Sequence, residues 1–331
     1  MQTKQLGKRK LGNSGLEVAP LVFGGNVFGW TVKDEKSASE LLDHFVDGGF
    51  NMIDTADVYS NWIPGNHGGE SEIIIGKWLK QSGKRDRVLI ATKSGLDMGN
   101  GRKGLSRKHI LRSADESLAR LQTDYIDLYQ SHTEDKETPL EETLEVYAEL
   151  IKLGKVRAIG ASNFQSATLL SALKISRGKN LPRYESLQPE YNLYERAKFE
   201  GEPENVCRKN QIGVIPYFSL ASGFLTGKYR SEKDLENRSR GSRVQKYLNP
   251  RGLRILAALD EVSKQYSATP AQISLAWLLA KPTITAPIAS ATSVKQLDEL
   301  FGATRVKLDP AAVQKLDQAS AYSEEEERNV A

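Results

Sequence analysis

The sequence contains very little cysteine and no long apolar run. Cys207 is the single cysteine among 331 residues, which excludes an intrachain disulfide and favours a reducing compartment. No apolar stretch approaches the length that spans a bilayer, and residues 1–5 do not open a secretory signal peptide. These absences predict a soluble, cytoplasmic protein that does not bind a membrane.

The chain also lacks a strong charge of one sign. Lys and Arg total 46 against 42 Asp and Glu, a net charge of +4, so nothing indicates nucleic-acid binding. The acidic run 324–327 is interpreted as a solvated tail. No metal-ligand cluster is seen, and no metal is expected. Apolar residues make up 39% of the chain, enough for a sizeable core.

Short apolar runs alternate with longer amphipathic stretches along the chain. Runs such as 88–90 and 212–215 are apolar at successive positions, as strands buried on both faces require. A hairpin is predicted across 8–11 and 16–19. Strands are predicted at 21–23, 51–54, 88–92, 125–130, 156–160, 185–188, 212–216 and 283–287. Helices are predicted at 36–48, 70–81, 107–121, 140–153, 165–177, 195–209, 252–266, 270–280 and 293–300.

This alternation of strands and helices predicts the fold class. Eight β/α units indicate an α/β protein, a (β/α)8 TIM barrel with an N-terminal β-hairpin, as a single domain over 1–331. A doubly wound sheet would carry a glycine-rich phosphate turn after its first strand, but residues 24–29 lack the G-x-G-x-x-G spacing. Ser106 is predicted to cap the third helix, and Thr138-Pro139 precedes the fourth.

Four polar residues lie where predicted strands end: Asp54, Tyr59, Lys93 and His132. The C-terminal strand ends of a parallel barrel meet on one face, where its chemistry gathers. Taken singly, each residue has a structural explanation, as a cap, a core aromatic, a surface charge or a satisfied polar group. Because all four are predicted to lie at one face of the barrel, a catalytic role is favoured over four separate structural roles.

The four side chains suit the protonation of an oxygen. A phenol has an ordinary pKa of about 10, which a buried ammonium nearby lowers. Asp54 can keep Lys93 charged, Lys93 can stabilise the phenolate of Tyr59, and His132 can donate a hydrogen bond to a substrate oxygen or shuttle the proton. Because no obvious nucleophile is paired with a base, an external hydride donor is needed.

These residues and their neighbours resemble the aldo-keto reductase family, and in particular its branch similar to potassium-channel β-subunits. The matching stretches, from about Leu11 to about residue 318, are 48–59 (GGFNMIDTADVY), 69–72 (GESE), 89–93 (LIATK), 124–132 (DYIDLYQSH) and 154–163 (GKVRAIGASN). The resemblance implies a barrel that binds a nicotinamide dinucleotide, with Tyr59 as general acid, Lys93 lowering its pKa, Asp54 supporting Lys93, and His132 orienting the carbonyl.

The resemblance also implies the cofactor contacts. Ser162, Asn163 and Gln188 match partners of the nicotinamide carboxamide, which needs donors and acceptors, and Tyr217 matches the aromatic that stacks on the ring. Residues 219–229 resemble a pyrophosphate-binding loop, followed by a flap over 230–248 in which Arg240 is the best aligned anion contact. The remaining expected contacts are Gly25, Asn26, Asp54, Ser219, Leu220, Gly223, Lys228, Ser290, Thr292, Gln296 and Glu299.

Two departures from the family pattern concern specificity. Gln296 stands where many members place an arginine against the 2′-phosphate, so NADP(H) over NAD(H) is a family expectation that this chain weakens; Lys295 is an alternative source of charge. The loop 60–68 is longer than the simplest family version. Its Trp62 is predicted either to line the substrate mouth, beside Tyr59 and His132, or to pin the loop to the barrel.

The favoured function is an NADPH-dependent oxidoreductase that reduces aldehydes or activated ketones to alcohols. Two alternatives stay open: an NAD(P)-dependent sugar or polyol dehydrogenase, and a nicotinamide-binding regulatory subunit like the channel β-subunits. His132 counts against the latter, because those subunits tend to lack it. The expected partner is a small-molecule carbonyl substrate, whose identity the sequence leaves open together with the formation of a homo-oligomer.

Overall fold

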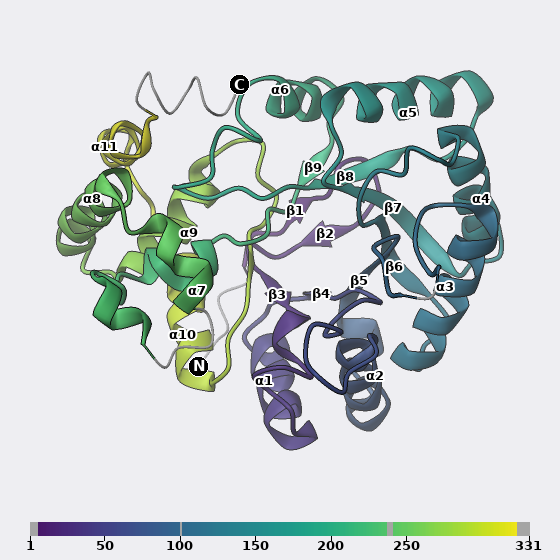
Figure 1. The fold of residues 1–331 in the computed structure, drawn as a ribbon, viewed down its shortest axis with the longest axis horizontal. Coiled ribbons are helices and arrows are strands. Elements are labelled where there is room, and N and C mark those ends of the chain that lie inside the picture. The colour runs from purple at the N-terminus through teal and green to yellow at the C-terminus, as the bar shows by residue number, and fades with distance from the viewer. Residues whose placement is uncertain (1–5, 100, 237–240, 323–331) are drawn as a thin grey trace.

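A barrel of parallel strands surrounded by helices forms the core of the fold (Figure 1). The computed structural model describes residues 6–99, 101–236 and 241–322. Within those residues the sheet order is β10-β3-β4-β5-β6-β7-β8-β9, and a bridge between Val214 and Ile284 joins its two ends. The strands are β3 (Val22–Gly24), β4 (Met52–Asp54), β5 (Leu89–Ser94), β6 (Ile126–Ser131), β7 (Val156–Ser162), β8 (Tyr184–Gln188), β9 (Gly213–Val214) and β10 (Ile288–Ala289).

The strands are buried on both faces, as their uninterrupted apolar runs predict. All residues of β6 are buried, because one set of side chains fills the barrel and the other packs under the helices. The (β/α)8 prediction is confirmed. The predicted hairpin is confirmed as well, as β1 (Arg9–Lys10) paired antiparallel with β2 (Glu17–Val18).

The hairpin packs against the interior of the barrel at its N-terminal end. Leu11, Leu16 and Val18 form one buried cluster with inward-facing side chains of the strands, among them Val22 and Met52. Figure 1 shows β1 and β2, in purple, inside the ring of helices. Apolar side chains thus fill this end of the barrel, and the opposite end, where the strands finish, is the one expected to hold a functional cleft.

Most helices lie where the sequence predicts them; most alternate with the strands, and the last two follow β10. They are α1 (Glu35–Asp47), α2 (Glu70–Ser82), α3 (Arg107–Leu121), α4 (Leu140–Lys152), α5 (Ser166–Lys179), α6 (Glu202–Lys209), α7 (Gly241–Val244), α8 (Pro250–Tyr266), α9 (Pro270–Ala280), α10 (Val294–Ala303) and α11 (Pro310–Ser320). Ser106 is the N-cap residue of α3, but its side chain makes no capping hydrogen bond. In the described part of the chain, no helix is long and apolar enough to cross a membrane.

Two predicted elements begin later than expected, and helices α7 and α11 are absent from the predicted set. The predicted helix 195–209 begins only at Glu202, because Gly201 has a φ of 92° and interrupts it. Helix α11 was not predicted, although Asp309 caps it and Pro310 opens it. The eighth strand pairs with β3 at Ile288–Ala289 and not over 283–287.

The displaced eighth strand has a local cause. The segment first contacts β9, through the Val214–Ile284 bridge and a 2.8 Å bond from Thr285 N to Val214 O. Pro287 then has no N–H to donate, and its carbonyl accepts from Val22 N at 3.0 Å. Regular pairing with β3 therefore starts only after the proline.

Candidate active site

The four predicted catalytic residues meet at the C-terminal ends of adjacent strands. Asp54 is the last residue of β4, and Lys93 lies on β5, whose backbone pairs with both β4 and β6. His132 directly follows β6, and Tyr59 lies in the loop after β4. Parallel pairing in this register places the side chains at one end of the barrel, as the sequence predicts.

Lys93 is the centre of the group. Its side chain is 0% exposed, and its ammonium Nζ donates to Asp54 Oδ2 at 2.7 Å and to the Thr55 carbonyl at 2.7 Å. The third contact of Nζ is the Tyr59 hydroxyl, at 3.3 Å. A buried ammonium is tolerated only with such compensation, so Asp54 and Thr55 hold a cation directly beside the phenol.

The second carboxylate oxygen of Asp54 is held by two glutamine side chains. Gln188 Nε2 donates to Asp54 Oδ1 at 2.9 Å and Gln130 Nε2 at 3.3 Å. Gln188 also donates to Gln130 Oε1 at 3.3 Å. These bonds orient the carboxylate that supports Lys93, and the sequence analysis assigned no role to Gln130.

Burial and neighbouring charges shift the pKa values of Lys93 and Tyr59 in opposite directions. Burial alone would lower the pKa of Lys93, but Asp54 and then Tyr59 raise it above its ordinary value, so the ammonium stays charged. For Tyr59, burial raises the pKa, and this exceeds the lowering by Lys93. The sequence expectation that Lys93 lowers the pKa is correct for that contribution, but the net pKa of the phenol is raised.

His132 lies next to Tyr59 at the floor of the site. The two rings are 6.0 Å apart between centroids and inclined by 71°. Burial, followed by the charge of Lys93, lowers the pKa of His132 well below its ordinary value. The imidazole is therefore neutral at pH 7 and carries one N–H that can be donated.

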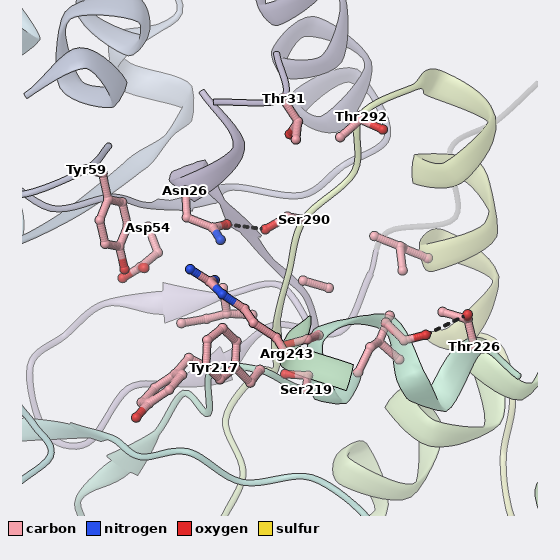
Figure 2. Close-up of a pocket in the computed structure, with 18 of the residues that line it drawn as sticks. Asn26, Thr31, Asp54, Tyr59, Tyr217, Ser219, Thr226, Arg243, Ser290 and Thr292 are labelled. Atoms are coloured by element: carbon pink, nitrogen blue, oxygen red, sulfur yellow. Dashed lines mark hydrogen bonds between the residues drawn. The ribbon is translucent and has the colours of Figure 1, made fainter. Parts of the chain in front are cut away.

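Tyr59 and His132 line a large cleft of about 810 Å3 (Figure 2). It extends from these two residues past Tyr217 to Thr292 and Gln296 on the far side. A cleft of this size suits a ligand larger than a simple aldehyde. The predicted residues that line it are Asn26, Asp54, Tyr59, Trp62, His132, Ser162, Asn163, Gln188, Tyr217, Ser219, Leu220, Gly223, Lys228, Ser290, Thr292, Gln296 and Glu299.

One wall of the cleft is a hydrogen-bonded group next to the catalytic residues. The Tyr217 hydroxyl donates to Asn163 Oδ1 at 2.8 Å, and Asn163 Nδ2 donates to the His132 carbonyl at 3.1 Å. The Ser162 hydroxyl donates to the Gln188 carbonyl at 3.0 Å. Because Gln188 also holds Asp54, this wall and the catalytic group form one connected network.

Comparison with known proteins agrees with this geometry. The model of the aldo/keto reductase family matches residues 20–321. The chain belongs to the aldo/keto reductase family. It is 36% identical to the aldo-keto reductase YhdN of Bacillus subtilis, over 84% of this chain and 81% of the relative. It is 33% identical, over 96% of both chains, to a probable voltage-gated potassium channel subunit beta of Arabidopsis thaliana. An aldo-keto reductase of Schizosaccharomyces pombe, whose name specifies NADP(+), is 33% identical over 96% of this chain and 92% of its own.

In this oxidoreductase, Trp62 both lines the cleft and packs on Tyr59. The two rings lie 5.6 Å apart, Trp30 lies 6.1 Å from Trp62, and Trp62 is 37% exposed. The loop that carries Trp62 is fixed by Glu70, which accepts from the backbone of Ser60 at 3.1 Å and of His67 at 2.7 Å. Both sequence interpretations of Trp62 therefore describe the same arrangement.

The loop after β9 has an unusual backbone. Ala221, Ser222 and Gly223 have consecutive positive φ values of 47°, 57° and 97°. Two N–H groups of the run are already used within the loop: Ala221 N donates to the Phe218 carbonyl at 2.7 Å, and Gly223 N donates to the Leu220 carbonyl at 2.8 Å. Lys228 Nζ lies 3.6 Å from where a Cβ of Gly223 would stand. Ser222, Gly223 and Lys228 all line the cleft, so this tight loop brings a cation to it.

Among the described residues of the segment 230–248, Arg243 lines the cleft. Figure 2 shows Arg243 reaching between Asn26 and Tyr217, and its guanidinium lies 5.5 Å from the centroid of Trp30. Arg240, predicted for this role, lies outside the described residues. Arg230 instead forms a two-pronged ion pair with Asp260, at 2.9 and 2.7 Å. The sequence offered several arginines in this loop, and nothing local distinguished Arg243.

The far end of the cleft is built from β10 and α10. Ser293 accepts from Gln296 N and caps α10, while Gln296 Oε1 accepts from Thr292 N at 2.9 Å and from the Thr292 hydroxyl at 3.1 Å. The Ser290 hydroxyl donates to Asn26 Oδ1 at 2.6 Å (Figure 2). Gly25 does not line the cleft; its carbonyl accepts from Ser71 at 2.8 Å in the buried layer behind.

Proposed function

We propose that this protein is an NADPH-dependent reductase that converts aldehydes or activated ketones to alcohols. The observation that carries the proposal is the Tyr59 hydroxyl 3.3 Å from the ammonium of Lys93, at the floor of a cleft with neutral His132 beside it. A phenol backed by a buried cation can release its proton to an oxygen, since the cation stabilises the phenolate that remains.

The residues of the cleft fit a nicotinamide dinucleotide. Tyr217 offers an aromatic face, Asn163 and Gln188 offer amide groups, and the ammonium of Lys228 beside Gly223 suits a diphosphate. Arg243 adds a second cation within the cleft, which favours a cofactor rich in phosphate. When bound here, the cofactor supplies the hydride.

The chain's own residues then handle the proton and the carbonyl. Neutral His132 orients the carbonyl oxygen by donating a hydrogen bond, and Tyr59 delivers the proton to that oxygen. Lys93 stabilises the resulting phenolate, and Asp54, held by Gln130 and Gln188, keeps Lys93 charged and in place. Trp62 shields the reacting group from water and contacts apolar parts of the substrate.

Single-turnover mixing tests this function. Protein loaded with NADPH is mixed with a panel of aldehydes while nicotinamide absorbance is followed, and the same is done with Tyr59→Phe and with NADH. Loss of absorbance that depends on Tyr59 is expected. Hydride loss undiminished in Tyr59→Phe contradicts the role of Tyr59, NADPH binding without any hydride transfer indicates a cofactor-binding regulatory protein, and failure to bind nicotinamide contradicts the whole proposal.

A further inference from the structure

Asp57 is a buried carboxyl group in the loop between Asp54 and Tyr59, and the proposed mechanism does not use it. Its backbone N–H donates to the Lys93 carbonyl at 3.0 Å, which fixes the loop to β5. The side chain is 0% exposed, and neither carboxyl oxygen accepts a hydrogen bond from a described residue. An ionised carboxylate in that position would be costly, because it has lost its water and no hydrogen bond of ordinary geometry replaces that water.

The neighbouring buried carboxylate is fully compensated. Glu72, on α2, accepts from the Thr92 hydroxyl at 2.6 Å and from Arg120 Nε at 2.6 Å. Arg102 and Arg120 are also paired with Glu116. The two arginines whose charges act on Asp57 are therefore already paired with other carboxylates, and Glu72 adds negative charge beside Asp57.

Several elements contribute the charge that acts on Asp57. The groups are Glu72 from α2, Arg120 from α3, Arg102 from the loop before α3, Tyr129 from β6, and Tyr59 from the same loop. Burial first, and then the charge of Glu72, raise the pKa of Asp57, whereas Arg120, the backbone N–H of Val58 and Arg102 lower it. The raising effects are larger, and the pKa of Asp57 is about 8. In turn, negative charge on Asp57 raises the pKa of Tyr59.

We propose that Asp57 is a positioning residue that stays protonated at neutral pH and thereby keeps a negative charge away from the buried pair of Lys93 and Tyr59. The inference rests on the proposed function, in which Tyr59 gives up a proton. When Asp57 loses its own proton at alkaline pH, the phenolate of Tyr59 becomes harder to form, and carbonyl reduction slows. The proton on Asp57 thus sets an upper pH limit for the reaction.

The test compares pH profiles of the single-turnover hydride transfer from NADPH between pH 6 and pH 9.5. The wild-type rate is expected to fall about three- to tenfold between pH 7 and pH 9, as a nearby charge weakens a general acid. In Asp57→Asn this fall is absent or displaced to higher pH. The exposed Asp97, in the loop after β5, provides the control, because Asp97→Asn makes the same chemical change and should keep the wild-type profile.

The outcomes separate the two proposals. Wild-type transfer with superimposable profiles for Asp57→Asn, or a rate lowered by one constant factor at every pH, overturns the role given to Asp57. Absence of hydride transfer in the wild type at every pH overturns the proposed function itself.

A second measurement does not depend on activity. Infrared difference spectra between pH 6.5 and pH 9.5, on protein carrying 13C-labelled aspartate, report whether an aspartic acid C=O band disappears as the pH rises. The wild type is expected to lose such a band, and Asp57→Asn, where it folds, to lack it. A wild-type spectrum without an aspartic acid band at pH 6.5 refutes the inference.

Discussion

Replacing Asp57 by Asn should make the protein more stable than the wild type, by a margin that grows as the pH rises from 5 to 7. The folded protein holds the proton of Asp57 up to about pH 8, whereas the ordinary pKa of an aspartyl group is 3.8. Between these values the unfolded chain is ionised at this position and the folded protein is not. Wild-type stability from this group is thus fully present below pH 3.8 and is lost as the pH rises toward 8.

The magnitude follows from this difference in proton binding. Each pH unit between the two pKa values costs the wild type about 1.4 kcal/mol of unfolding free energy. The interval from pH 5 to pH 7 lies wholly between them, so the wild type should lose about 2.7 kcal/mol relative to the variant. All other ionisable groups are common to both proteins, and their contributions cancel in the comparison.

Urea unfolding of the two proteins at pH 5, 6 and 7 measures this margin. Fluorescence and circular dichroism must give coincident transitions, so that the unfolding free energies are defined. Asp97→Asn is the control, since an exposed carboxyl group in the same half of the barrel should give a margin that does not change with pH. A margin for Asp57→Asn that stays constant from pH 5 to pH 7 would refute the reasoning, because it would mean that Asp57 is ionised in the folded protein.

Three further substitutions test the cleft. Lys93→Met leaves a buried carboxylate without its cation and should lower the unfolding free energy by about 3–5 kcal/mol, measured by urea unfolding; wild-type stability would contradict the ion pair. Arg243→Ala should weaken NADPH binding about tenfold or more and reduce its salt dependence, and an unchanged Kd in a nicotinamide fluorescence titration would remove Arg243 from the cofactor site. Trp62→Ala should raise KM for aromatic aldehydes about tenfold while small aldehydes change little; equal losses for both classes in steady-state assays would argue for a purely structural tryptophan.

Local sequence patterns were sufficient for the strand order and for the catalytic group. Uninterrupted apolar runs mark strands buried on both faces, and in a parallel barrel the polar residue that ends each run must arrive at the same end. The sequence alone therefore predicts that Asp54, Lys93 and His132 lie together, and the strand register places them so. The place of each residue depends only on where its own strand ends and on the rule that the parallel strands of a barrel finish at the same end.

Tertiary contacts decided what the local patterns could not. Gln130 and Gln188 hold Asp54 from positions 76 and 134 residues away. Arg243, which follows β9 by 29 residues, lines the same cleft as Tyr59. Asp57 has the same local features as many surface aspartates, yet it is fully buried, and the arginines that act on it are paired with Glu72 and Glu116. Burial and charge pairing depend on segments far apart in the chain, so the protonation state of a side chain is a property of the assembled barrel.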